Sequence, residues 1–283
     1  MTTPDDTAEA GIEIDTEDAL NEGMGQASAP EHPFTLAIDI GGTGLKASVL
    51  DKSGAMVANR LKVATTYPMP PQKMVETLTK LVAALPEADR VAAGFPGMLR
   101  KGHILSAPKF NTEHGPGSKI DPKLVAAWDN FDLAGALAAS IGKPTRVAND
   151  ADVQGLAVVA GTGLELVVTL GTGFGTSAFM DGRLLPHLEI AHQPFRKGET
   201  YDQQIGEGPR KEIGDERWNN RVRKAILGMK ALFFYDHVYI GGGNARRLNR
   251  DNLGDLLEQI TIVDNTAGIL GGVALWDDQH LAV

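Results

Sequence analysis

The sequence of 283 residues contains no cysteine, so disulfides, thiolate metal sites and cysteine nucleophiles are all excluded. It also contains no run of about twenty apolar residues, which is the length that a helix needs to cross a bilayer. A net charge of −9 disfavours duplex nucleic acid and anionic membranes as the main partners, because both would need a basic surface. We therefore expect a protein that binds neither nucleic acid nor membrane.

The N-terminus lacks two further features. It does not have the basic and then apolar pattern of a secretion signal, so we expect a cytoplasmic protein. Residues 1–33 have few large apolar side chains and are rich in Asp, Glu, Ala, Gly and Pro, a composition typical of disorder. We expect these residues to form a mobile acidic tail, and the folded part of the chain to begin at residue 33 or 34.

What the sequence does contain is one glycine-rich hairpin pattern, present twice. Apolar residues 34–40 lead into the turn Gly41-Gly-Thr-Gly44 and a second apolar stretch. Apolar residues 166–170 lead in the same way into Gly171-Thr-Gly-Phe-Gly175 and another such stretch. One hairpin of this kind is weak evidence. Two in register, roughly half a chain apart, predict a duplicated domain that holds phosphate between its halves.

The remaining hydrophobic periodicity predicts an α/β protein of two similar lobes, because each half has a strand meander followed by alternating helices and strands. Further strands are predicted at residues 55–63, 91–95, 145–148, 183–185, 237–240 and 260–263, and helices at 74–85, 133–141, 153–159, 218–234 and 265–276. We expect an N-terminal lobe over residues 34–148 and a C-terminal lobe over residues 149–265. The last helix, at about residues 266–283, is expected to rejoin the first lobe.

The two turns have the chemistry of a phosphate site. Glycines at the end of a strand let backbone N–H groups surround an anion, and threonine adds a hydroxyl donor. A carboxylate beside a phosphate needs a cation between them, so Asp39 indicates Mg²⁺. The residues predicted to bind phosphate are Asp39, Gly41, Gly42, Thr43, Lys46, Gly171, Thr172, Gly173 and Gly175. Taken alone, the first hairpin could equally be a turn with chance glycines.

Neither common nucleotide-binding motif fits these turns. The P-loop requires Gly-Lys-Ser/Thr at the start of a helix, whereas Lys46 lies within a predicted strand. The dinucleotide fingerprint requires a glycine where Thr176 stands, and it also requires a helix after the turn. The phosphate site is therefore expected to be of another kind.

A candidate general base follows the predicted strand at residues 145–148, in the sequence Asn149-Asp-Ala-Asp152. A carboxylate at a strand end that faces a cleft is suited to accept a proton from a hydroxyl group. The alternative is an N-cap, since Asn and Asp are favoured there. We expect Asp150 to be the base, Asp152 to be a charge in the first helical turn, and one member of the group to be the cap.

Glu189-Ile-Ala-His192 is a second polar motif. Its carboxylate and imidazole lie on one face if the segment is helical, and such a pair can bind vicinal hydroxyls. On its own the pair could also be a surface ion pair. A zinc site is not expected, because no further histidine has ligand spacing.

Together these residues resemble the sugar kinases of the ROK family (repressor, open reading frame, kinase) in the actin/hexokinase-like superfamily, over residue 34 to the C-terminus. Within the family the chain looks most similar to polyphosphate-dependent glucokinases. The resemblance implies two RNase H-like lobes with a cleft between them. It also implies sugar contacts from Gly97 in Gly94-Phe-Pro-Gly97 and from Asn111, Asn149, Asp150, Glu189 and His192, and a nucleotide-side loop at Gly241, Gly242 and Gly243.

The chain departs from the family pattern in three places. Ala191 replaces the glycine of Glu-x-Gly-His. The cysteine-rich zinc motif is absent, so His192 is not expected to hold zinc. The sugar-contacting glutamate that follows this motif has no secure match, and Glu199 is the available candidate.

The resemblance implies transfer of a phosphoryl group from polyphosphate or ATP to a hexose, with Mg²⁺, Asp150 as base and a homodimer as in many relatives. The most favoured acceptor is glucose, giving glucose 6-phosphate. Basic residues in the second half favour polyphosphate, although a solvated helix face explains several of them equally well. They are Arg196, Lys197, Arg210, Lys211, Arg217, Arg221 and Arg223.

Three other classes remain as alternatives. A ROK repressor needs a helix-turn-helix, for which residues 1–33 are too short and too acidic. A non-catalytic sugar sensor or an actin-like ATPase would keep the fold without transferring phosphate to sugar. Retention of Asp150 beside two complete phosphate turns counts against a catalytically inactive kinase.

Overall fold

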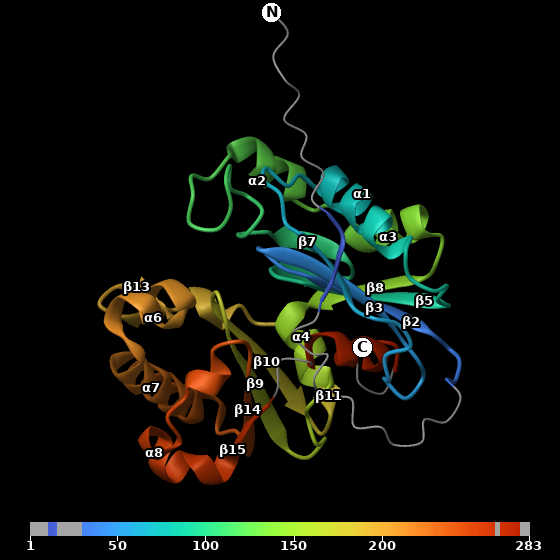
Figure 1. Cartoon of the computed structure of the whole chain (residues 1–283). Coiled ribbons are helices and arrows are strands. Elements are labelled where there is room, and N and C mark those ends of the chain that lie inside the picture. Colours follow the sequence, from blue (N-terminus) through green and yellow to red (C-terminus); the bar gives the residue numbers. More distant parts are fainter. Residues whose placement is uncertain (1–10, 16–29, 264–266, 278–283) are drawn as a thin grey trace, which may run out of the picture.

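The computed structural model describes residues 11–15, 30–263 and 267–277. Two sheets dominate it, with helices packed on both faces of each (Figure 1). The first sheet has the strand order β1-β4-β3-β2-β5-β8 and the second has the order β11-β10-β9-β14-β15. The fold is therefore α/β, as the hydrophobic periodicity predicts.

The elements of the first half are β1 (Glu13–Ile14), β2 (Thr35–Ile40), β3 (Gly44–Leu50), β4 (Leu61–Ala64), α1 (Pro71–Val82), β5 (Arg90–Phe95), β6 (Met98–Arg100), β7 (His103–Ser106), α2 (Pro122–Trp128), α3 (Leu133–Ile141), β8 (Thr145–Asn149) and α4 (Asp150–Leu156). Strands β2, β3 and β4 form an antiparallel meander, and β5 and β8 are added parallel to β2.

The elements of the second half are β9 (Leu164–Leu170), β10 (Phe174–Met180), β11 (Arg183–Leu184), η1 (Ile190–His192), β12 (Pro194–Arg196), β13 (Glu199–Thr200), α5 (Tyr201–Ile205), α6 (Glu207–Ile213), α7 (Asp215–Phe233), β14 (His237–Gly241), η2 (Ala245–Arg247), α8 (Arg250–Leu253), η3 (Gly254–Gln259), β15 (Ile260–Ile262) and α9 (Ala267–Ala274). Strands β9, β10 and β11 repeat the antiparallel meander, and β14 and β15 repeat the parallel additions. The predicted duplication is confirmed in the strand pairing, because both sheets have an antiparallel meander followed by two parallel strands.

Helix α4 lies between the two sheets, next to α9 (Figure 1). It contacts β5 and β8 of the first sheet and β9 and β10 of the second. The approach of α9 is close, because a Cβ on Gly271 would lie 1.7 Å from the carbonyl oxygen of Val153 in α4. Helix α9 also packs on β2, β3 and β5, so the end of the described chain lies against the first sheet.

The outer faces of the sheets carry two large apolar cores. Helices α1 and α3 cover the first sheet through the buried residues Met74, Leu78, Leu81, Leu133 and Leu137. Helix α7 covers the second sheet through the buried residues Trp218, Val222, Ile226 and Met229. With their outer faces buried in this way, the sheets leave only their edges and strand ends for a site.

The structure differs from the predicted elements in two places. The strand predicted at residues 55–63 is reduced to β4 at its end, and Met56 forms only an isolated bridge to Leu50. The composition predicts a mobile acidic tail over residues 1–33, of which residues 1–10 and 16–29 lie outside the described ranges, whereas residues 13–14 form β1, paired with β4. A strand of two residues has no periodicity from which it could be predicted. The division into lobes at residue 148 stays a prediction.

In the ranges that the structure describes, no helix is long and apolar enough to span a membrane.

Candidate active site

A cavity of about 270 Å³ opens where the ends of both sheets meet. Both glycine turns line it, together with the first turn of α4 and the segment around η1. The predicted residues found in its wall are Asp39, Gly41, Gly42, Thr43, Lys46, Gly97, Asn149, Asp150, Gly171, Thr172, Gly173, Gly175, Glu189, His192, Gly242 and Gly243. Residues that are distant in sequence therefore converge on one site.

Each glycine turn is closed by a backbone hydrogen bond, although the first turn is one residue longer than the second. Gly41 N donates to Gly44 O at 2.9 Å, and Gly171 N donates to Gly173 O at 3.1 Å. In the first turn no larger residue fits at Gly41, because a Cβ there would lie 2.7 Å from Gly44 O. Tyr67 additionally donates to the carbonyl oxygen of Gly42 at 2.7 Å. Both turns thus hold the chain tightly against the cavity, as a phosphate-binding turn requires.

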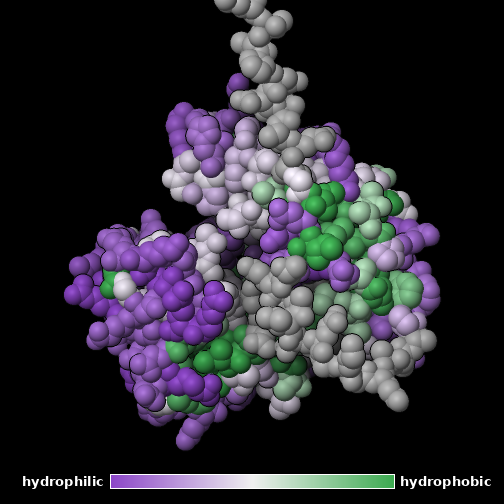
Figure 2. Space-filling view, in the orientation of Figure 1, coloured by the Kyte–Doolittle hydropathy of each residue, from purple (hydrophilic) through white to green (hydrophobic). Residues whose placement is uncertain are grey.

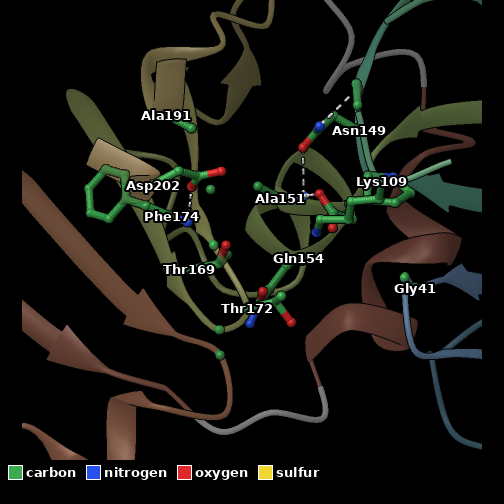
Figure 3. A pocket seen from close by; sticks show the side chains of 18 of the residues that line it. Gly41, Lys109, Asn149, Ala151, Gln154, Thr169, Thr172, Phe174, Ala191 and Asp202 are labelled. Carbon is green, nitrogen blue, oxygen red and sulfur yellow. Dashed lines mark hydrogen bonds between the residues drawn. The ribbon is translucent and has the colours of Figure 1, made fainter. Parts of the chain in front are cut away.

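Asn149 is the N-cap of α4. Its Oδ1 accepts a hydrogen bond from Ala151 N at 2.8 Å, while its Nδ2 donates to Gly97 O at 3.0 Å (Figure 3). One side chain therefore caps the helix and fixes the loop that follows β5. Asp150, the first residue of α4, keeps its carboxylate in the cavity wall, with Oδ1 accepting from Ala151 N at 2.9 Å.

Burial shapes the titration of the acids in the cavity. Burial raises the pKa of Asp150. The neighbouring carboxylate of Glu189 raises this pKa further, whereas the ammonium group of Lys109 lowers it. Burial and then the proximity of Asp150 raise the pKa of Asp39 to about 6, against the opposing effect of Lys46 and other cations. Two carboxylates near one another in a buried site are a common arrangement for proton transfer and cation binding.

Asp152 lies in the first turn of α4, as expected. It is buried there, and its Oδ1 lies 2.9 Å from Nδ1 of His187. Nε2 of the same histidine lies 3.8 Å from Oε2 of Glu189. Burial opposes protonation of His187, but its two acidic partners prevail and raise its pKa to about 10. This histidine has no signal in the sequence, because its partner lies 35 residues away.

Glu189 directly precedes the single turn η1 and His192 is its last residue, and both line the cavity. Ala191, which stands where the family pattern has glycine, is buried between them. Burial opposes ionisation of Glu189, yet His187 and further cations lower its pKa below the usual value. The carboxylate is therefore ionised and able to accept hydrogen bonds from hydroxyl groups.

Three expected site residues lie elsewhere. Gly241, at the end of β14, is absent from the cavity wall, and Asn111 Oδ1 is buried without a hydrogen-bond partner among the described residues. Lys109, two residues before Asn111, lines the cavity instead. Glu199 bonds to Gln204 and does not reach the cavity wall.

Asp202 in α5 reaches the cavity in place of Glu199, and its Oδ1 accepts from Phe174 N at 2.6 Å. Burial raises its pKa. Asp202 and Lys109 reach the cavity from opposite sides (Figure 3). Neither has a signal in the sequence, because each lies in a segment without a recognisable motif.

Several of the basic residues at positions 196–223 are paired within the described part of the chain. Arg210 bonds to Glu207 and Asp215, and Lys211 lies 3.2 Å from Glu207. Arg221 donates to a backbone carbonyl. The surface over α6 and α7 is hydrophilic (Figure 2), as the alternative of a solvated helix face predicts. The cations that reach the cavity wall are Lys46, Arg60 and Lys109.

The residues present fit a Mg²⁺ ion of the kind that protein carboxylates share with phosphates. Asp39 is buried in the cavity near Asp150, with its pKa raised to about 6. No group of three or more His, Asp or Glu side chains in the described ranges could hold a metal alone. Mg²⁺ is commonly bound through one or two carboxylates with the remaining ligands from phosphates and water. Asp39 is the side chain that would hold it.

Comparison with known proteins gives concordant matches. The model of the ROK family matches residues 35–188. The solved inorganic polyphosphate/ATP-glucomannokinase of Arthrobacter sp. strain KM is 30% identical, with a TM-score of 0.72 over 88% of this chain and 100% of that one. The polyphosphate glucokinase of Mycobacterium tuberculosis (strain CDC 1551 / Oshkosh) is 27% identical over 261 residues, which are 87% of this chain and 91% of that one.

A ROK family glucokinase from Streptomyces griseus, solved in complex with glucose and AMPPNP, is 17% identical, with a TM-score of 0.70 over 86% of this chain and 98% of that one. These structural matches confirm the predicted actin/hexokinase-like fold. The family model spans more than half of the chain, and the relative from Arthrobacter aligns with most of it. The chain belongs to the ROK family.

Proposed function

We propose that this ROK protein is a glucokinase that transfers a phosphoryl group from polyphosphate or ATP to the 6-hydroxyl of glucose. Sugar kinase activity of the hexokinase type is supported by the relatives named above. The observation that carries the proposal is the position of Asp150. Its buried carboxylate lies in the wall of a cavity that also contains both phosphate turns.

In this mechanism the carboxylate of Asp150 accepts the proton of the sugar hydroxyl as the oxygen attacks the terminal phosphorus of the donor. A pKa raised by burial makes this carboxylate a better proton acceptor than an exposed aspartate. Asn149 holds the loop at Gly97 through its side-chain amide, so the sugar and the base are placed by one residue. The carboxylate of Glu189 accepts hydrogen bonds from the other sugar hydroxyls. The imidazole of His192 exchanges hydrogen bonds with them as donor or acceptor.

The leaving phosphate lies between the two glycine turns, whose backbone N–H groups and threonine hydroxyls stabilise the charge that develops during transfer. Lys46 is placed to neutralise part of this charge. Mg²⁺, when bound at Asp39, would supply additional positive charge at the donor phosphates. Because the cavity lies where two separate sheets meet, a small approach of the sheets would exclude water that otherwise hydrolyses the donor.

Both the charge of the cavity wall and the named relatives support polyphosphate as the phosphoryl donor. Lys46, Arg60 and Lys109 give the cavity wall three cations, which suits a polyanion, and relatives that use polyphosphate support this choice. ATP remains the second donor, with Gly242 and Gly243 on the side where a nucleotide would lie. A cytoplasmic location and a homodimer stay predictions.

The test is an assay of several hexoses against ATP and polyphosphate with Mg²⁺. We expect donor consumption to depend on sugar, to be fastest with glucose, and to produce glucose 6-phosphate. Donor hydrolysis that no sugar accelerates would indicate an ATPase or a polyphosphatase instead. Sugar binding without turnover would indicate a sensor.

A further inference from the structure

The described part of the acidic tail reaches the cations at the edge of the cavity. Strand β1 pairs antiparallel with β4, and Asp15 N donates to Arg60 O at 2.8 Å. The side chain of Asp15 is fully buried, at 0% exposure. Its carboxylate lies 3.0 Å from Arg60 Nε, 3.5 Å from Lys46 Nζ and 3.7 Å from Lys62 Nζ. One carboxylate of the tail is therefore in contact with three cations.

The register of the sheet explains this arrangement. Asp39 is opposite Lys46, Lys46 is opposite Lys62, and Lys62 is opposite Glu13. Side chains that are directly opposite on neighbouring antiparallel strands lie on the same face. Two lysines flanked by two acidic residues therefore form a row that begins at the cavity residue Asp39 and ends on the tail at Glu13.

Two of the three cations also belong to the phosphate site, because Lys46 and Arg60 line the cavity. Lys46 is directly opposite Asp39 in the sheet and Arg60 lines the same cavity, so both lie close to the predicted position of the metal and the donor. Lys62 extends the row away from the cavity. A donor with more phosphates than the cavity can hold would lie along these cations.

We propose that Lys46, Arg60 and Lys62 form a subsite for the trailing phosphates of a linear polyphosphate, and that the Asp15 carboxylate occupies this subsite when no donor is bound. The proposal rests on the phosphate-binding role proposed for the cavity. A phosphate group competes well for these cations, because it carries at least as much charge as a carboxylate and more acceptor oxygens.

The tail then acts as an intramolecular competitor of the donor. Strand β1 is only two residues long, and the neighbouring apolar residues Ile12 and Ile14 are 46% and 54% exposed. Little apolar area holds the strand in place, so its local opening is inexpensive. The apparent affinity for the donor is reduced by the fraction of molecules in which the subsite is open.

The experiment compares Asp15→Asn with the matched control Glu13→Gln. Both remove one carboxylate in or directly after β1, but Glu13 is exposed and forms none of the three ion pairs of Asp15. We expect Asp15→Asn to tighten the binding of tripolyphosphate, measured by calorimetry without sugar, by about fivefold or more. Glu13→Gln should change it by less than about twofold. Equal effects of the two variants, or no effect of Asp15→Asn, would overturn the proposal.

A third variant tests the cations themselves. Lys62→Gln should weaken the binding of tripolyphosphate, and in the double variant the gain from Asp15→Asn should be reduced because both changes act on one subsite. In the kinase assay, Asp15→Asn should lower the KM for polyphosphate and leave kcat and the KM for sugar unchanged. Strictly additive effects in the double variant would show that Asp15 and Lys62 act separately, and would overturn the subsite.

A measurement on the unmodified chain guards against variants that do not fold. Tripolyphosphate should increase hydrogen exchange at the Asp15 amide, since displacement of the carboxylate weakens its bond to Arg60. Unchanged or slower exchange would overturn the proposal. The calorimetry and the exchange require no turnover, so a failure of the proposed kinase function would be seen separately, as donor that binds but is not transferred.

Discussion

Nδ1 of His187 lies 2.9 Å from Oδ1 of Asp152, and the side chains are only 8% and 5% exposed. The pair joins the first turn of α4, which carries the proposed base Asp150, to the segment that carries Glu189. With a pKa raised to about 10 by its acidic partners, His187 is a cation at neutral pH. We infer that it positions two parts of the sugar site relative to one another.

Replacing this histidine should cost stability. His187→Gln leaves the buried Asp152 without its cation, and removing one partner of a buried ion pair typically costs about 3–5 kcal/mol in the free energy of unfolding. We expect urea unfolding at pH 7 to show this loss and the KM for sugar to rise. The double variant His187→Gln/Asp152→Asn should recover most of the stability, since it removes the unpaired charge.

The same pair predicts a dependence on pH. The folded-state pKa of His187 is raised from 6.5 to about 10, so its contribution is complete below pH 6.5 and is lost as pH rises through about 10. The difference in unfolding free energy between the unmodified protein and His187→Gln should therefore shrink as pH rises from 7 to 10.5. A constant difference over this range would show that the histidine is not a buried cation.

The proposed base gives the most direct test of catalysis. Asp150→Asn keeps the shape of the side chain but removes the proton acceptor, and loss of a general base typically lowers the rate by about 10²–10⁴-fold. We expect kcat to fall within this range, while the dissociation constant for glucose changes by less than about threefold. The checks are steady-state kinetics and calorimetry with glucose. A variant with the original kcat would exclude Asp150 as the base.

The parts of the site that the sequence predicts are those made by consecutive residues. Both hairpin turns and the Asn149-Asp150 pair can be recognised because a turn or a helix start determines their residue types locally. The structure brings them together through parallel strand pairing between β2 and β5, β5 and β8, and β9 and β14. Fold class follows from the same local patterns.

The parts that the sequence does not predict depend on contacts across long separations. His187 lies between Pro186 and Leu188 and carries no motif, and its significance comes from Asp152 on another element. Lys109 lies in a turn and Asp202 in the short helix α5, and the position of each at the cavity is set by packing. The two-residue strand β1 is held by ion pairs of Asp15 rather than by apolar burial. The sequence does not predict this strand, because an acidic segment with few apolar residues has the composition of a disordered one.

The second glycine turn allows binding and folding to be separated. At Gly171 a Cβ would meet no atom within 4 Å, although the residue lines the cavity. Gly171→Ala should therefore fold normally but place a methyl group in the space proposed for phosphate. We expect the KM for the donor to rise about tenfold, equivalent to about 1.4 kcal/mol, and the KM for sugar to change little.

Two further glycines serve as controls for that measurement. Gly208→Ala in α6 also meets no atom within 4 Å, but it lies outside the cavity wall and should leave the donor KM unchanged. Gly41→Ala would bring a Cβ to 2.7 Å from the carbonyl oxygen of Gly44, so thermal unfolding should show a loss of stability. If Gly171→Ala and Gly208→Ala behave alike, the second turn does not bind the donor.

Lys109 should set the pH range in which the acids of the cavity are ionised. It lowers the pKa of Asp39, Asp150, Glu189 and Asp202 against the effect of burial. In Lys109→Met these pKa values rise, so the carboxylates take up protons at a higher pH. Since Asp150 must be ionised to accept the sugar proton, the acid limb of kcat/KM should move upward by about half a pH unit or more.

Lys119→Met removes the same charge from an exposed residue 78% accessible to solvent, and its profile should coincide with that of the unmodified protein. An acid limb that stays in place in Lys109→Met would show that this lysine does not act on the base.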